Sequence, residues 1–175
     1  ITDTERGVNK NLTANYNYAE NTDPSINSFN SDGFTLNTVY SDWNDTGHDY
    51  VAWSFRKQPG FFDVVTYTGD GTSNRDISHN LSCTIGSIFL KRRDTVDDWY
   101  VYHRHIDSDV TNSPYYKLVL NSSAARANNG SNGIIGTTST TFKVNGTGNT
   151  NGATYVAYLF AAGSDSDSQI FGDDS

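Results

Sequence analysis

The chain has 175 residues, enough for one ordinary domain or two small ones, and a formal net charge of -8. This acidic balance argues against a nucleic-acid partner, because contacts to phosphate need clustered Lys and Arg. No apolar run approaches the roughly 18 residues of a membrane-spanning helix, so no membrane insertion is expected. A single cysteine, Cys83, excludes an internal disulfide, and the fold must rest on packing alone.

The composition favours strands and turns, because eleven Tyr, nine Phe and three Trp stand among many Thr, Ser, Asn and Gly. In chain order, strands are predicted over residues 34–39, 50–56, 61–68, 85–92, 99–105, 115–120, 140–144 and 154–161. Turn sequences such as Gly69-Asp70-Gly71 and Asn145-Gly146 separate most of them. The one helix-tolerant stretch, residues 122–127, is short. The pattern predicts an all-β fold, a jelly-roll-like β-sandwich.

An internal repeat divides the chain. The string FTLN at 34–37, followed by YVAWSF at 50–55, matches FKVN at 142–145, followed by YVAYLF at 155–160. Residues 11–14 and 121–124 align more loosely, so the two copies lie about 105 to 110 residues apart. This internal half-unit repeat predicts the back half of one unit in residues 1–57 and a full sandwich unit in 58–163. Residues 164–175 are expected to form a flexible acidic tail.

Five strings occur in order along the chain: YVAWSFRK, PGFFDVVTYTGDGT, ISHNL, DWYVYHR and TYVAYLFA. Together they resemble a domain of large structural proteins of marine bacteriophages, found in tail-fibre and lectin-like contexts. The resemblance implies a virion-associated, β-rich module with no catalytic residues to carry over. Residues 82–86 depart from the family pattern, since SCTIG replaces the Gly and Pro common there.

One candidate binding site is a loop between two predicted strands, where an aromatic platform is surrounded by polar groups. Stacking of a sugar on Trp43 would suit this chemistry, because aromatic faces cover sugar C–H groups while polar neighbours fix the orientation. The competing interpretation is that Trp43 packs against the sheet. The candidate glycan-binding residues are Tyr40, Trp43, Asn44, Asp45 and His48.

A second candidate is an interface with other subunits. Trp53 and Trp99 fall in strand patterns and are assigned to the core or to such an interface. The apolar pair Ile170-Phe171 interrupts the polar tail and is expected to dock on a neighbouring subunit or on the domain itself. The candidate interface residues are Trp99, Tyr100, Tyr102, His103, Ile170 and Phe171.

The sequence offers few residues in patterns that suit catalysis or metal binding. His79, His103 and His105 lack an obvious third ligand, so no metal site and no cofactor are expected. The aspartates at positions 63, 97, 98, 107 and 109 offer carboxylates for glycoside hydrolysis, but nothing in the sequence places two across a cleft, and Glu is nearly absent. Asp165 opens a calcium-like loop that lacks the required Gly and Glu. We therefore expect no enzymatic activity.

These observations predict a structural module on the exterior of a phage virion, in a tail fibre, knob or capsid decoration. Its expected partners are copies of itself and other virion proteins, since a half-unit presents a sheet edge that another chain can complete. The first alternative is a carbohydrate-binding adhesin that attaches to host surface glycans. The second alternative is a polysaccharide depolymerase.

Overall fold

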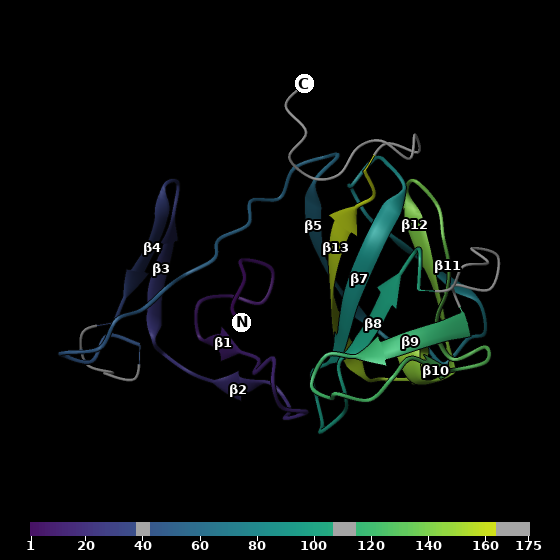
Figure 1. The fold of residues 1–175 in the computed structure, drawn as a ribbon, viewed down its shortest axis with the longest axis horizontal. Coiled ribbons are helices and arrows are strands. Elements are labelled where there is room, and N and C mark those ends of the chain that lie inside the picture. Colours follow the sequence, from purple (N-terminus) through teal and green to yellow (C-terminus); the bar gives the residue numbers. More distant parts are fainter. Residues whose placement is uncertain (38–42, 107–114, 164–175) are drawn as a thin grey trace.

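The computed structural model describes residues 1–37, 43–106 and 115–163. Its regular secondary structure consists almost entirely of antiparallel strands, which confirms the predicted all-β class (Figure 1). The larger sheet has six strands in the order β10-β9-β8-β7-β13-β5. Their bounds are β5 (Phe62–Thr68), β7 (Ile85–Arg92), β8 (Tyr100–His103), β9 (Tyr116–Val119), β10 (Ala127–Asn128) and β13 (Thr154–Ala161).

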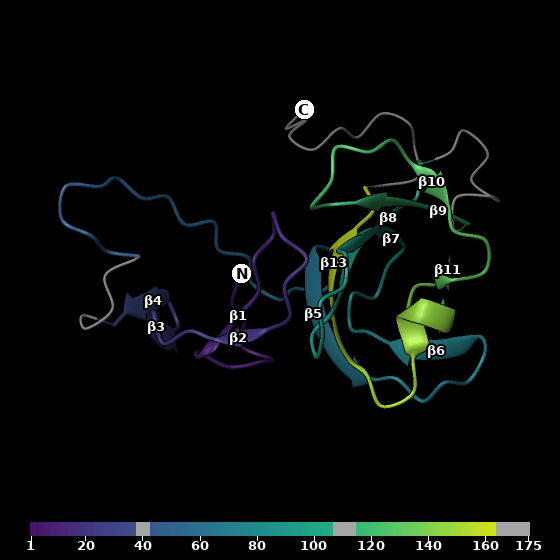
Figure 2. The same ribbon diagram turned by 90° about the horizontal axis from the view of Figure 1, so that it is seen from below.

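The smaller sheet has three strands in the order β11-β12-β6, namely β6 (Arg75–Ser78), β11 (Gly133–Thr137) and β12 (Thr141–Asn145). Figure 2 shows strands of the larger sheet on one side of the core and β6 and β11 on the other. Side chains of both sheets, such as Ile88 and Leu159 from one and Phe142 and Val144 from the other, form one apolar cluster. The fold is therefore the predicted β-sandwich.

Strand β13 is the centre of the structure. It pairs with β5 on one side and β7 on the other, along almost its whole length. Because side chains alternate along a strand, Tyr155, Ala157 and Leu159 enter the core between the sheets, while Val156 and Tyr158 enter a second apolar cluster on the opposite face. Burial on both faces explains why TYVAYLFA is apolar almost without interruption.

The N-terminal residues cover that opposite face of the larger sheet. They include the short antiparallel pair β1 (Lys10–Asn11) and β2 (Asn21–Thr22). Leu12 is buried in the second apolar cluster beside Trp99 and Tyr158. The Trp99 indole Nε1 donates a hydrogen bond to the Thr13 carbonyl over 3.0 Å, which fixes this segment on the sheet.

A hairpin and an extended stretch stand apart from the sandwich. The hairpin consists of β3 (Ile26–Asn30) and β4 (Gly33–Leu36), and the chain returns from it to β5 (Figure 1). The described residues of this return, 43–57, contain no strand. A turn at Gln58–Gly60 then leads into β5, so the predicted division after residue 57 falls at this turn. The predicted tail, residues 164–175, lies outside the described residues.

Every predicted strand but one overlaps an observed strand, and the ranges 85–92 and 154–161 coincide with β7 and β13. The prediction of a strand over 50–56 is wrong for this chain, because that segment has no neighbour to pair with among the described residues. The prediction missed β1, β2, β3, β6, β10 and β11, which are short or rich in Gly and polar residues. The short 3₁₀ helix η2 (Gly146–Asn149) lies beyond the stretch judged helix-tolerant.

Candidate functional site

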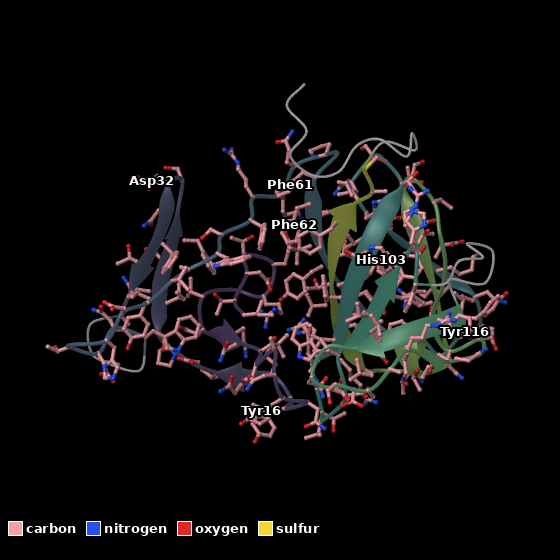
Figure 3. All side chains as sticks on the ribbon, viewed as in Figure 1. Tyr16, Asp32, Phe61, Phe62, His103 and Tyr116 are labelled. Atoms are coloured by element: carbon pink, nitrogen blue, oxygen red, sulfur yellow. The ribbon has the colours of Figure 1, made fainter. Side chains whose placement is uncertain are left out.

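The most unusual surface feature is a row of exposed apolar side chains at residues 50–56, which we call the 50–56 segment. Val51 is 82% exposed and Trp53 is 80% exposed, and Tyr50 and Phe55 are also exposed. Its C-terminal end is anchored to the sandwich, because the Phe55 ring lies 5.5 Å from the rings of Phe62 and Phe160. Figure 3 labels Phe61 and Phe62 at the place where this stretch meets β5. Contiguous apolar exposure of this kind marks a contact surface.

The same sequence pattern is buried where it recurs in β13. Val156 and Ala157 are buried between two neighbouring strands, whereas their counterparts Val51 and Ala52 are exposed. The difference does not come from the residues, since YVAWSF and YVAYLF are nearly the same. It comes from the absence of flanking strands around the 50–56 segment within the described part of the chain.

The predicted glycan-binding loop is present as a local turn. Trp43 and Asp45 are half-buried, while Asn44 and His48 are exposed. The Asp45 backbone N–H donates to the Tyr50 hydroxyl over 3.0 Å, and Gly47 supplies the positive φ of 83° that the turn requires. Tyr40 lies outside the described residues. The four described residues of this candidate site, Trp43, Asn44, Asp45 and His48, thus lie in one loop.

The predicted interface residues separate into two groups. Trp99, Tyr100 and Tyr102 are buried inside this chain, so they are core residues here and offer no surface to a partner. His103 at the end of β8 is exposed. Ile170 and Phe171 lie outside the described residues. The interface prediction fails for these three residues because the smaller sheet covers Tyr100 and Tyr102, while the N-terminal residues cover Trp99.

A polar pocket of about 160 Å³, which was not predicted from the sequence, opens at one end of the sandwich. The Lys117 ammonium group lies 5.6 Å from the centre of the Tyr100 ring that forms part of its wall. Burial raises the pKa of Tyr100 to about 12, so its hydroxyl stays protonated. The pocket is lined by Leu90, Arg92, Asp97, Asp98, Trp99, Tyr100, Lys117, Val119, Asn129, Asn132, Thr147, Gly148 and Tyr155.

A buried ionic network joins the N-terminal residues to the sheet. The Arg6 guanidinium contacts Asp3 over 2.6 Å and Glu20 over 3.0 Å, and it donates to the Tyr158 hydroxyl over 3.0 Å. Arg93 from the sandwich completes the network by pairing with Glu20 over 2.9 Å. Burial alone would raise the pKa of Glu20, but hydrogen bonds from Arg93 and Arg6 hold that pKa below its ordinary value.

The residues considered for metal or hydrolytic chemistry do not converge. Among residues 1–37, 43–106 and 115–163, no group of three or more His, Cys, Asp or Glu side chains is placed to hold a metal ion. His79 is buried, and this burial lowers its pKa and favours the neutral ring. Asp63 is buried against Lys57 at 3.1 Å, whereas Asp97 and Asp98 line the polar pocket. Asp107, Asp109 and Asp165 lie outside the described residues.

Fold and surface together define an antiparallel β-sandwich whose N-terminal part exposes a near copy of its own central strand. The chain belongs to the family described as a domain of unknown function (DUF7483), whose model matches residues 1–165. Comparison with curated proteins and with solved structures gives no match. Within the described residues, no helix has the length and apolar character needed to cross a membrane.

Proposed function

We propose that this chain is a non-enzymatic structural module that associates with copies of itself and with other particle proteins on the exterior of a bacteriophage virion, as part of a tail fibre, knob or capsid decoration. The observation that carries the proposal is the exposure of Val51 and Trp53 in a segment whose counterpart forms the buried centre of a sheet. The virion setting rests on the family resemblance of the sequence.

The energetics favour covering this segment. Burial of a large apolar side chain stabilises a structure by about 1.5–3 kcal/mol, and the 50–56 segment exposes several such side chains together. No strand pairs with residues 51–56 among the described residues, so a sheet of a partner molecule can pair with their backbone. Extended segments of this type add to the sheets of partner molecules through backbone hydrogen bonds and alternate side chains.

The proposal predicts that the chain forms a defined assembly with a mass that is a multiple of 19.3 kDa. In the double variant Val51→Lys/Trp53→Lys, the assembly is expected to dissociate to monomers, because two buried ammonium groups would replace two apolar contacts. Light scattering after size-exclusion chromatography, with negative-stain imaging of the same fractions, measures both outcomes.

The matched control is Val96→Lys, which places a lysine at an exposed apolar residue in the loop between β7 and β8. This variant is expected to keep the mass of the unmodified chain. A monodisperse monomer of the unmodified chain at micromolar concentration contradicts the proposed self-association.

A second candidate function is recognition of host surface glycans, and the half-buried state of Trp43 next to the exposed Asn44 and His48 favours it. We expect binding on a glycan array to fall at least about tenfold in Trp43→Ala, because stacking on an aromatic ring supplies much of such affinity. Trp53→Ala serves as the control, since it removes an exposed indole outside this loop. Equal binding by the two variants counts against the Trp43 site.

A further inference from the structure

We infer that the 50–56 segment is the central strand of a second sandwich unit, and that it inserts between strands equivalent to β5 and β7. The partner on both of its edges is a further segment of the same sequence type as this chain's front half, residues 61–106, in which the place that β13 takes between β5 and β7 is open. The inference deepens the proposed assembly by naming the partner segment. It rests on the equivalence of the hairpins β3–β4 and β11–β12 and on the repeated sequence that follows each of them.

The hairpin β3–β4 has the same construction as β11–β12. In β3–β4, Ile26 lies opposite Leu36 and Ser28 lies opposite Thr35, with an irregularity between Ile26 and Ser28. In β11–β12, the corresponding pairs are Ile134 with Val144 and Gly136 with Lys143, with an irregularity at the same place. The matching strings FTLN and FKVN put Leu36 at the position of Val144. A shared bulge in a shared register is a specific feature, because bulges re-aim a strand.

The repeated sequence that follows each hairpin has different surroundings in the two places. After β12, residues 155–160 form the centre of the larger sheet, and Ala157 lies opposite Val65 of β5 and Leu90 of β7. After β4, residues 50–55 repeat that sequence without such neighbours among the described residues. The equivalence therefore places Ala52 opposite the counterparts of Val65 and Leu90 in the partner segment.

In this chain's own front half, the place between β5 and β7 is already filled by β13. Both β5 and β7 are paired with β13, so neither offers the 50–56 segment a place inside the sheet. Insertion needs a further front half that lacks its own central strand. Such a front half has the same pair of acceptor strands, and it gives the alternating side chains Tyr50, Ala52 and Ser54 one face of the sheet and Val51, Trp53 and Phe55 the other.

The junction between the two units is short and fixed. The 50–56 segment passes through Lys57 into the turn at Gln58–Gly60, where the Gln58 N–H donates to the Phe62 carbonyl over 2.9 Å. The Lys57 ammonium group pairs with Glu5 over 2.8 Å and with Asp63 over 3.1 Å. Because the central strand of one unit runs directly into β5 of the next, the units would follow one another without a flexible linker, as in repeat proteins.

The test supplies an unpaired front half within the same polypeptide. A second copy of residues 61–106 is placed ahead of Ile1, and amide hydrogen exchange of residues 50–56 is followed by mass spectrometry. Exchange in this segment is expected to slow by at least about 100-fold relative to the unextended chain, because its amides enter a sheet. The control extension carries Val65→Pro and Phe89→Pro in the added copy only, which removes one ladder donor on each side of the inserted segment, at the positions opposite Ala52 and Trp53.

Protection of residues 50–56 in the extended chain, lost with the proline control, supports the inference. Fast exchange in the segment while β13 stays protected overturns it, since β13 protection shows that the sandwich is folded. The measurement is made on fractions that light scattering identifies as monomeric. If residues 50–56 are protected in the extended chain but the unextended chain never self-associates, the inference stands and the proposed assembly is rejected. If the unextended chain assembles but residues 50–56 stay unprotected in the extended chain, the inference is rejected.

Discussion

Replacing Trp99 by alanine is expected to lower the free energy of unfolding by about 3–5 kcal/mol, the usual cost of truncating a large buried aromatic residue. The indole is 0% exposed, and it packs among Leu12, Val156 and Tyr158. The variant also loses the hydrogen bond from Nε1 to the Thr13 carbonyl, which is left without this donor. Urea denaturation followed by circular dichroism measures the change.

The matched control is Trp53→Ala, since Trp53 is 80% exposed. In the isolated monomer this substitution is expected to change the free energy of unfolding by no more than about 0.5 kcal/mol. The pair of variants separates the two roles that a strand tryptophan can have, as part of the core or as a contact for a partner. Similar destabilisation by the two substitutions would contradict both assignments.

Replacing Arg6 by alanine is expected to cost about 3–5 kcal/mol, because removing one partner of a buried ion pair leaves the other charge without compensation. The Arg6 side chain is 0% exposed and Asp3 is nearly buried. Without Arg6, the Asp3 carboxylate keeps only the hydrogen bond from the Tyr158 hydroxyl as a side-chain contact across to the sheet. Thermal and urea unfolding measure the loss of stability.

Hydrogen exchange locates the effect of Arg6→Ala, since the amides of residues 1–22 are expected to lose protection before those of β13. The control is Arg92→Ala, which removes an exposed ion pair with Asp94 at 2.8 Å and is expected to cost no more than about 1 kcal/mol. An Arg6→Ala chain as stable as the Arg92→Ala chain would mean that the network does not hold the N-terminal residues on the sheet.

Local patterns were sufficient for the class of fold and for its main strands. The predicted strands over residues 85–92 and 154–161 have the observed bounds of β7 and β13, because both strands are long and largely buried, so their sequences are rich in apolar residues. The repeat was also readable, since FTLN and FKVN occupy the same position in two hairpins. The short strands β1, β2 and β10 were missed, because two-residue pairings leave no period to detect.

The candidate sites were only partly predictable. The loop around Trp43 was proposed from residue types that are adjacent in the sequence, and its role in glycan binding stays a prediction. The polar pocket was missed because it joins Arg92, Lys117 and Thr147, which approach each other only when the two sheets pack together. The network of Arg6, Glu20 and Arg93 was missed for the same reason, since Arg93 is far from Arg6 and Glu20 in the sequence and only folding brings them together.

The sequence by itself determined the strand periodicity, the turn positions and the repetition of a half-unit. Tertiary structure decided which copy of the repeated strand is buried, because burial depends on what lies on either side of a strand and on both of its faces. Two nearly identical strings therefore differ in exposure: Val156 lies between β5 and β7, whereas Val51 has no such neighbours among the described residues. The same principle makes Trp99 a core residue and leaves Trp53 available for contact.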